Sequence, residues 1–216
     1  MYKRIALLAI GSLGFLGGAF AADGPYVEGT HYKRIEPAQP TFAAPGKVEV
    51  VEVFSYACHA CDAAQPAVDR WKKTMAPNVE FSYLPAVFFD AWALMARSYF
   101  VAKALKILDK THQPTLDANF KLKQPLNTVD DVAKLYSQFG VTPEAIKKAM
   151  TSFGVEAEFN RAKKRVMAYG VSSTPTIVVH GKWRVNGSGA VGGFDEMFKV
   201  VDHLVQMEAA QMQAKR

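Results

Sequence analysis

The chain has 216 residues, half of them hydrophobic, and a formal net charge of +6 at pH 7. This length and composition allow one sizeable hydrophobic core, with room for a second lobe. The charge is modest and comes mostly from lysines spread over expected helix faces, which argues against a nucleic-acid-binding protein. The densest basic cluster, residues 161–165, lies in an expected helix and is interpreted as a solvated face.

The N-terminus has the pattern of a secretory signal peptide. Lys3 and Arg4 precede an uncharged apolar run, residues 5–16, and residues 19–21 read Ala-Phe-Ala, which fits a cleavage site. The run is short and followed by glycines, which argues against a membrane anchor or a buried helix. No later stretch of the sequence is long and apolar enough to cross a bilayer. We therefore expect residues 1–21 to be removed and the mature protein to be soluble and exported.

The segment that follows is rich in Pro, Gly, Ala and polar residues. It covers residues 23–46 and is expected to run over the surface, with Tyr26, Tyr32 and Ile35 as isolated apolar anchors. One short strand is expected near residues 31–35.

The next stretch is the one around which the chain is organised. Residues 48–54 are apolar and β-branched, as in a strand, residues 55–57 form a turn, and Cys-His-Ala-Cys at 58–61 opens a helix. Cys58 and Cys61 are the only cysteines. The free N–H groups and the dipole at a helix N-terminus stabilise an anion, so a thiol placed there ionises more readily. The two-residue spacing lets a disulfide form and break with little change in the backbone.

This pair favours redox chemistry over its alternatives. A structural disulfide more often closes a longer loop, although an inert disulfide between close cysteines stays open as an alternative. A zinc site needs further ligands, and only His59 is near. Covalent haem attachment requires a histidine directly after the second cysteine, where this chain has Asp62. We expect neither a metal nor a bound cofactor.

The central strand contains two glutamates, Glu49 and Glu52, whose spacing puts them on opposite faces. A strand that is apolar on both faces is typically central in a covered parallel sheet. Glu49, near the beginning of the strand, is expected to reach water. Burial would raise the pKa of Glu52, and we hypothesise that this residue lies beneath the cysteine pair and handles protons for Cys61. The alternative is a rim glutamate with access to water.

The helix that begins at Cys58 contains Pro66, which is expected to kink it, and a turn at 76–78 leads to a second strand at 79–84. Residues 86–168 then have a helical pattern. The expected helices cover 91–108, 129–139 with a capping box at Thr128 and Asp131 and an end at Gly140, one that starts at Thr142 and Pro143, and a last one before Gly170. Their aromatic and methionine stripes are interpreted as helix-bundle core.

The strand pattern returns at 176–180 and 182–185, and His180-Gly181 is expected to form a hairpin turn between the two strands. A loop at 187–193 and a helix at 194–214 follow. Strands therefore flank a helical block on both sides. We interpret residues 86–168 as an inserted helical domain between two parts of an α/β domain, residues 22–85 and 169–216.

Three features together resemble the thioredoxin superfamily: the CxxC on a strand-to-helix turn, Pro66 eight residues after the first cysteine, and Ser-Thr-Pro-Thr at 173–176 before a later strand. The helical insertion and the export signal narrow the resemblance to the DsbA family of periplasmic thiol oxidases. It covers essentially the whole mature chain. It implies an α/β thioredoxin-like fold with an inserted α-helical domain, and a periplasmic location.

The resemblance also implies roles for individual residues. Cys58 would form the mixed disulfide with substrate and Cys61 would resolve it. Pro175 matches the cis-proline of the family, the alternative being an ordinary trans proline that opens a strand. Thr174 would lie opposite the cysteines and offer backbone hydrogen bonds to an extended substrate. Glu52 falls at the position of the buried acid of the family.

The sequence departs from the family between the cysteines and shortly after them. The best-known members have proline and then histidine between the cysteines, where this chain has His59 and Ala60. Gln65 stands where some members have a further acidic residue. Because the inter-cysteine dipeptide tunes thiolate stability, these departures bear on oxidising power. His59 either lowers the Cys58 pKa as a nearby cation or hydrogen-bond donor, or faces solvent with little effect.

The function implied is a monomeric oxidase that donates its disulfide to reduced, unfolded exported proteins and is reoxidised by DsbB, a quinone-linked membrane protein. One alternative is an exported reductase or isomerase on the same scaffold. Isomerases of the family usually add an N-terminal dimerisation domain, for which residues 23–46 are too short. A second alternative is a non-enzymatic chaperone or metal-binding protein.

Overall fold

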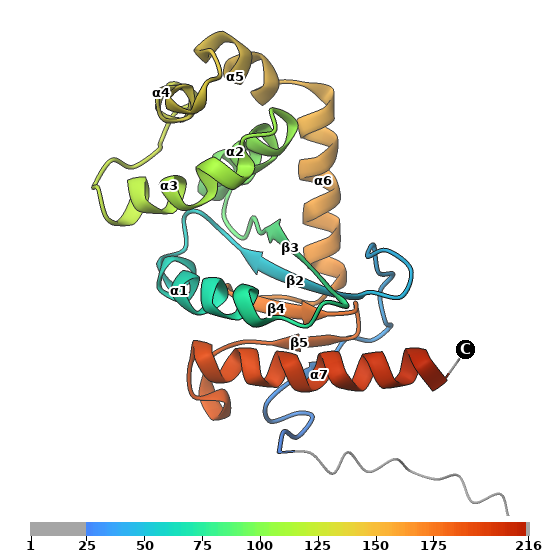
Figure 1. The fold of residues 1–216 in the computed structure, drawn as a ribbon. Coiled ribbons are helices and arrows are strands. Elements are labelled where there is room, and N and C mark those ends of the chain that lie inside the picture. The colour runs from blue at the N-terminus through green and yellow to red at the C-terminus, as the bar shows by residue number, and fades with distance from the viewer. Residues whose placement is uncertain (1–24, 215–216) are drawn as a thin grey trace, which may run out of the picture.

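The computed structural model describes residues 25–214, so the expected signal peptide lies outside the described residues. Within this described range, five strands form one sheet: β1 (Lys33–Arg34), β2 (Val48–Phe54), β3 (Val79–Pro85), β4 (Thr176–Val179) and β5 (Trp183–Val185). The α-helices of the same residues are α1 (His59–Thr74), α2 (Ala93–Ala104), α3 (Leu108–Phe120), α4 (Val129–Tyr136), α5 (Pro143–Met150), α6 (Phe153–Ala168) and α7 (Phe194–Ala214). This is a thioredoxin-like α/β fold with a helical insertion, as the sequence predicts (Figure 1).

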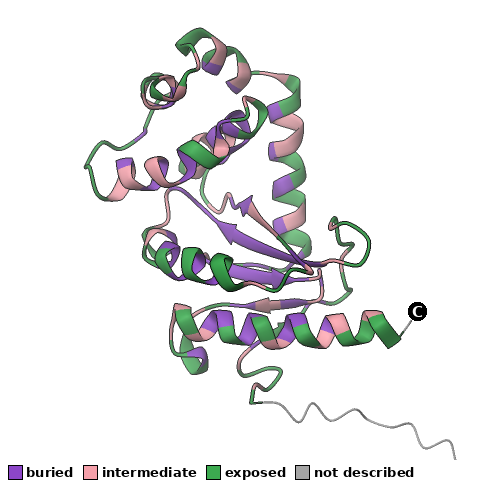
Figure 2. Ribbon diagram, viewed as in Figure 1, coloured by how far each residue is buried: buried purple, intermediate pink, exposed green. Residues whose placement is uncertain are grey.

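The sheet is mixed, and not all-parallel as the apolar character of its central strand suggested. Its order is β1-β5-β4-β2-β3, with β2 parallel to β3 and antiparallel to β4. β2 is nevertheless central and buried along its whole length (Figure 2). The chain passes through the helical insertion before β4, and β4 begins at the end of the sheet where β2 finishes. β4 is therefore antiparallel to β2, and β2 is buried as it would be in a parallel sheet.

The two faces of β2 pack against different parts of the chain. Val48 and Val50 belong to a core cluster with residues of α1, α7 and β4. Val51 and Val53 belong to a second cluster, which is built mainly from α2 to α6. Figure 1 shows α1 and α7 beside the sheet and the helical insertion (α2–α6) rising away from it, with the long α6 leading back to the strands. Because side chains alternate along a strand, Glu52 lies on the α1 face and Glu49 on the face of the insertion.

The insertion follows its sequence signals closely at two helix starts. Thr128 and Asp131 form the expected capping box of α4, and the Thr142 side chain accepts a hydrogen bond from the Ala145 backbone at the start of α5. A 3-10 turn (Ser137–Phe139) extends α4 to Gly140, which has a left-handed conformation. The side-chain oxygens of Thr128 and Thr142 satisfy backbone N–H groups that the first helical turn leaves unpaired.

The prediction of one helix over residues 91–108 is wrong. A short 3-10 helix (Asp90–Trp92) leads into α2, which ends at Ala104, and Lys106 then adopts a left-handed backbone with φ of 58°. This conformation reverses the chain, and α3 begins at Leu108. The sequence did not reveal α3, because Pro114 and several polar residues obscure its apolar face.

The hairpin between β4 and β5 turns at His180 and Gly181, as expected, although three residues separate the paired Val179 and Trp183. His180 and Gly181 both have positive φ, 50° and 66°, as a type I′ turn requires. Gly181 is also needed for space, since an added Cβ would lie 2.2 Å from the Gln39 carbonyl oxygen. The turn thereby allows the segment before β2 to run close against it.

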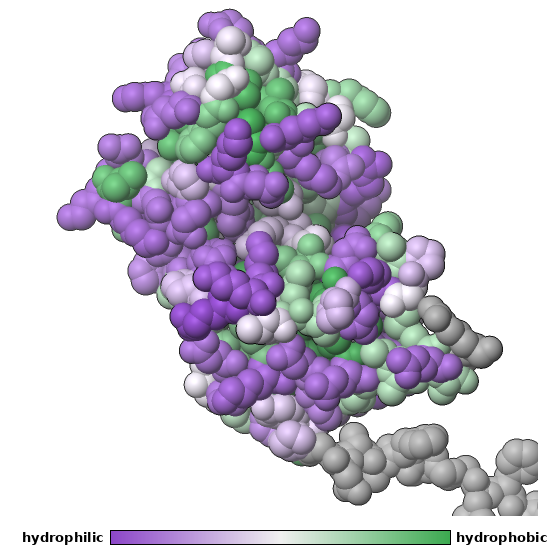
Figure 3. All heavy atoms as spheres, viewed as in Figure 1, coloured by the Kyte–Doolittle hydropathy of each residue, from purple (hydrophilic) through white to green (hydrophobic). Residues whose placement is uncertain are grey.

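Large hydrophobic side chains are exposed only singly in the described part of the chain. Only Phe153 and Met167 share an element, near the two ends of α6, and the full set is Val27, Phe42, Phe89, Leu122, Phe153 and Met167. In the space-filling view, hydrophilic side chains separate the hydrophobic areas (Figure 3). Among the described helices, none combines the length and the apolar character that crossing a membrane requires.

Candidate active site

The cysteine pair lies at the N-terminus of α1, directly after the active-site turn (Ser55–Ala57). Cys58 is the N-cap residue of α1, and its carbonyl accepts a hydrogen bond from the Cys61 backbone at 3.0 Å. Both cysteines are free thiols here. Cys58 is half-buried, whereas Cys61 is only 1% exposed. Substrate can therefore reach the first sulfur and not the second.

The two thiols differ in acidity. A hydrogen bond from Cys61 is the largest cause that lowers the pKa of Cys58, to about 6, and it outweighs the burial that would raise this pKa. The Thr174 side chain and the backbone N–H groups of Cys61 and Ala60 lower it further. Burial, followed by the neighbouring Cys58, raises the pKa of Cys61. At neutral pH the reduced pair is a thiolate at Cys58 beside a thiol at Cys61.

The loop before β4 faces this thiolate. The Thr174–Pro175 peptide bond is cis, as the resemblance implied, and the Cys58 sulfur lies 3.5 Å from the Thr174 carbonyl oxygen. A thiol can donate to that carbonyl, but a thiolate cannot. The loop therefore accepts from the Cys58 thiol through the Thr174 carbonyl, and it stabilises the Cys58 thiolate through the Thr174 side chain.

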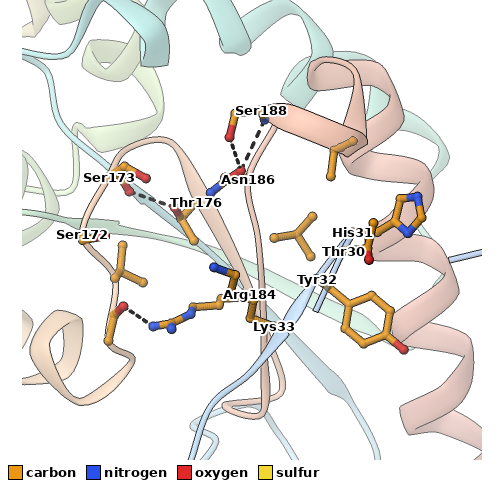
Figure 4. Close-up of a pocket in the computed structure, with 14 residues that line it drawn as sticks. Thr30, His31, Tyr32, Lys33, Ser172, Ser173, Thr176, Arg184, Asn186 and Ser188 are labelled. Carbon is orange, nitrogen blue, oxygen red and sulfur yellow. Dashed lines mark hydrogen bonds between the residues drawn. The ribbon is translucent and has the colours of Figure 1, made fainter. Parts of the chain in front are cut away.

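Hydrogen bonds behind the loop fix it to the sheet. The Arg184 guanidinium, from β5, donates to the carbonyls of Tyr169 and Gly170. The Thr176 hydroxyl donates to the Ser173 carbonyl at 2.8 Å. Figure 4 shows these side chains around a polar pocket of about 130 Å³ between the loop, β5 and the segment around residues 30–33. The loop thus has its own support, independent of the cysteines.

Glu52 lies on the α1 face of β2 and is 1% exposed, which excludes the rim alternative. Burial is the largest cause that raises its pKa, to about 8. Lys72 opposes this rise, while Cys58 and Asp69 add to it. Its Oε2 atom is buried without a hydrogen-bond partner among the described residues. A carboxyl group in this state can hold a proton near neutral pH.

The expectation that Glu49 reaches water is wrong. Glu49 is 3% exposed, and its Oε1 atom lies 2.8 Å from the Arg165 guanidinium. The Phe42 backbone donates to the same oxygen at 3.2 Å. The end of α6 covers this face of β2, so Arg165 serves a buried ion pair and is not part of a fully solvated basic face.

His59 is exposed, and its ring packs edge-to-face against Phe120 with the centroids 5.6 Å apart. The hydrogen bonds that lower the Cys58 pKa come from Cys61, Thr174 and the helix backbone. This arrangement favours the solvent-facing alternative for His59.

Sequence reasoning missed the contacts that α3 makes with the active site. Asn119 donates to the Tyr56 carbonyl at 2.9 Å, and His112 Nδ1 lies 2.9 Å from the Tyr56 hydroxyl. Lys121 lies 3.7 Å from Asp62, the residue after Cys61. The only signal was a histidine and an asparagine in a helix whose register the sequence did not define. These contacts connect the insertion to both sides of the cysteine pair.

Comparison with known proteins agrees with this arrangement. The family model described as DSBA-like thioredoxin domain matches residues 49–205. The thiol:disulfide interchange protein DsbA of Pseudomonas aeruginosa is 33% identical over 205 residues, which cover 95% of each chain. DsbA of Azotobacter vinelandii is 31% identical, over 89% of this chain and 96% of its own.

Solved structures show the same likeness. The crystal structure of Pseudomonas aeruginosa DsbA superposes with a TM-score of 0.80 at 32% identity, covering 88% of this chain and 97% of that one. The oxidoreductase DsbA from Xylella fastidiosa gives 0.79 at 31% identity, over 86% and 98% of the two chains. The likeness therefore spans both the sheet and the insertion.

Proposed function

Since the chain belongs to the DsbA-like thioredoxin family and is a thiol:disulfide oxidoreductase, we propose that its Cys58–Cys61 disulfide oxidises folding exported proteins. The observation that carries the direction of transfer is the lowered pKa of Cys58. A thiolate that is stabilised in the reduced protein favours the reduced state, and so makes the disulfide the stronger oxidant.

The reaction takes place in two exchanges. A substrate thiolate attacks the Cys58 sulfur, the Cys58–Cys61 bond breaks, and Cys61 leaves with the electron pair. A second substrate thiolate then attacks the substrate sulfur of the mixed disulfide, and Cys58 leaves as the stabilised thiolate. The substrate has lost two electrons and two protons, and the cysteine pair has gained the electrons. The exposure of Cys58 and the burial of Cys61 support this order of attack.

Glu52 is proposed as the proton donor to Cys61. The Cys61 sulfur leaves as a thiolate in a buried place where its charge is disfavoured. Glu52 is held protonated near neutral pH by burial and lies on the α1 face of β2, where its charge acts on Cys61. Transfer of its proton replaces the buried thiolate with a thiol.

The remaining groups bind and orient substrate. Thr174 and Pro175 lie beside Cys58, and the Thr174 backbone is proposed to pair with an extended substrate segment. His59, at the exposed N-terminus of α1, is proposed to contact substrate near the sulfur. The protein would act as a monomer in the periplasm after removal of residues 1–21, with reoxidation by a DsbB-like, quinone-linked membrane partner.

One observation supports a second candidate function, that of an exported reductase or isomerase. The Cys58 pKa of about 6 lies between the values of about 3.5 for a strong oxidant of this family and about 7 for thioredoxin. The His59-Ala60 dipeptide is the feature of the sequence that distinguishes this chain from strongly oxidising members.

The decisive experiment is a titration of the reduced protein, following thiolate absorbance in the ultraviolet, with Cys58→Ser as the control. We expect a single transition near pH 6 that the control lacks, and a disulfide that oxidises thioredoxin-type dithiols. A transition at about 7 or above, together with net reduction of protein disulfides, would transfer the assignment to the reductase.

A complementation test separates both enzymes from a chaperone. Cells that lack their own exported thiol oxidase should regain disulfide formation with the wild-type chain and not with Cys58→Ser. Full activity of the Cys58→Ser variant would indicate a non-enzymatic role.

A further inference from the structure

A buried chain of hydrogen bonds reaches from the helical insertion to the α1 face of the sheet. Tyr56 of the active-site turn lies 2.9 Å from His112 Nδ1, and His112 Nε2 lies 3.4 Å from Gln65 Oε1. Gln65 then donates from Nε2 to Asp69 at 2.9 Å and to the Tyr83 hydroxyl oxygen at 3.2 Å. These hydrogen bonds link helices α3 and α1 and strand β3.

The chemistry of the partners fixes the direction of every bond. The Asp69 carboxylate only accepts, so the Gln65 atom beside it is the amide nitrogen, and the Gln65 oxygen faces His112. His112 must then carry its proton on Nε2. Burial lowers the pKa of His112 to about 3, so the ring is neutral and Nδ1 accepts from Tyr56.

The Tyr83 hydroxyl proton, at the end of these hydrogen bonds, has no acceptor among the described residues. The Tyr83 oxygen accepts from Gln65, so its own O–H points elsewhere, and no described hydrogen bond takes it. The Tyr83 ring is held in place because it stacks on His112 with the centroids 4.1 Å apart. Burial, followed by Glu52, raises the pKa of Tyr83, so the hydroxyl keeps its proton.

The acceptor nearest in the sheet register is the carboxyl group of Glu52, on the neighbouring strand. Glu52 and Tyr83 are direct neighbours in the parallel pairing of β2 with β3, so their side chains point to the same face of the sheet. Among the described residues, Glu52 Oε2 is a buried oxygen without a hydrogen-bond partner. Beyond direct contact, one bridging water joins such a donor and acceptor at little energetic cost.

We propose that Tyr83 is a positioning residue that donates a hydrogen bond to Glu52 through one bridging water, with its orientation set by Gln65 and His112. This inference rests on the proposed proton transfer by Glu52. Through it, a helix of the insertion would determine how Glu52 presents its proton to Cys61. The other charged or titratable groups that act on Glu52 are Lys72, Asp69, Cys58 and Cys61.

The test is the Glu52 pKa in Tyr83→Phe, measured in the reduced protein by carbon NMR of labelled glutamate carboxyl groups and assigned with Glu52→Gln. The substitution keeps the ring and removes only the hydroxyl. Because the donor favours the carboxylate, its loss should raise the Glu52 pKa by about one unit. Gln65→Met, which releases the Tyr83 oxygen, should shift the pKa in the same direction by less.

Tyr99→Phe is the matched control, because its hydroxyl donates to the Tyr83 carbonyl at 3.1 Å and not to Glu52. It should leave the Glu52 pKa unchanged. An unchanged pKa in Tyr83→Phe, or an equal shift in the control, would overturn the proposal.

The rate of disulfide reduction against pH separates this inference from the role of Glu52 itself. Glu52→Gln should remove a step from the profile, and Tyr83→Phe should move that step by the same amount as the measured pKa. A step that survives in Glu52→Gln would reject the proton transfer by Glu52. A step that is lost in Glu52→Gln but unmoved in Tyr83→Phe would reject only the role of Tyr83.

Discussion

Cys58 and Cys61 differ in acidity although only two residues separate them. Cys58 has the helix N-terminus, the Cys61 thiol and Thr174 around its sulfur, whereas Cys61 lies one turn further into the core. The sequence alone predicts the favoured ionisation at a helix start. It does not predict the contribution of Thr174, because Thr174 lies 116 positions after Cys58 along the chain.

Thr174→Val should raise the Cys58 pKa, since it removes a hydroxyl that lowers this pKa and retains the shape of the side chain. The rise should be at most about one unit, the usual effect of one hydrogen bond to a charged group. Thiolate absorbance against pH measures it. Thr176→Val, whose hydroxyl bonds to Ser173, tests whether a disturbed loop alone has this effect, and an equal rise there would count against a direct contact.

Glu52 should make the oxidised protein less stable as pH rises. In the reduced protein its folded pKa of about 8 lies above its ordinary value of 4.5, and burial, the largest cause, persists in the oxidised protein, so the folded state binds the proton more tightly. Its contribution to stability is complete below about pH 4.5 and is lost as the pH rises through about 8. Glu52→Gln should therefore gain stability relative to wild type over that interval, by a few kcal/mol.

Urea unfolding of the oxidised protein across this interval measures the difference, since Cys58 does not titrate in the disulfide. Glu80→Gln, at an exposed position of β3, is the control and should follow wild type. Parallel curves of unfolding free energy against pH for Glu52→Gln and wild type would show that burial does not raise the Glu52 pKa.

At the scale of elements, the sequence was most informative where local chemistry decides. The capping oxygens of α4 and α5, the CxxC helix and the His180-Gly181 turn each depend on neighbouring residues. The boundary between α2 and α3 does not, because Lys106 takes its left-handed conformation from the way the two helices pack. The contacts of Asn119 and His112 were hidden for the same reason, since they follow from the placement of α3.

Asn119→Ala should loosen the active-site turn. Asn119 bonds the Tyr56 carbonyl through its amide nitrogen and the Leu126 backbone through its oxygen, so its removal leaves two backbone groups unpaired. We expect a loss of about 1 to 3 kcal/mol in the free energy of unfolding and faster amide hydrogen exchange at residues 56–58. Gln113→Ala, which removes a partly buried side-chain bond to Asp117 on the same helix, should change neither by a comparable amount.

At the scale of the whole molecule, two buried connections hold the insertion to the sheet on opposite faces of β2. The His112 chain reaches the α1 face, and the Glu49–Arg165 pair fixes the end of α6 to the other. The loop with Thr174 and Pro175 follows α6 directly. The position of that loop opposite Cys58 therefore depends on where α6 ends, and so on Arg165.

Arg165→Met should destabilise the protein strongly, because it leaves the Glu49 carboxylate buried without its cation. Removal of one partner of a buried ion pair costs about 3 to 5 kcal/mol. Arg161→Met is the matched control on the same helix. Arg161 itself is exposed and pairs with Glu158, which is only half-buried, and exposed pairs contribute about 0 to 1 kcal/mol.

Denaturant unfolding of both variants gives the two free energies, and a double variant, Glu49→Gln with Arg165→Met, identifies the cause. If the orphaned carboxylate is responsible, the double variant should recover part of the lost stability, because a neutral amide is less costly to bury than a charge. If the Arg165 stem matters through its packing on Phe42 and Tyr169, the double variant should be no more stable than Arg165→Met. The first outcome would establish that α6, and with it the loop opposite Cys58, is fixed to the sheet by charge.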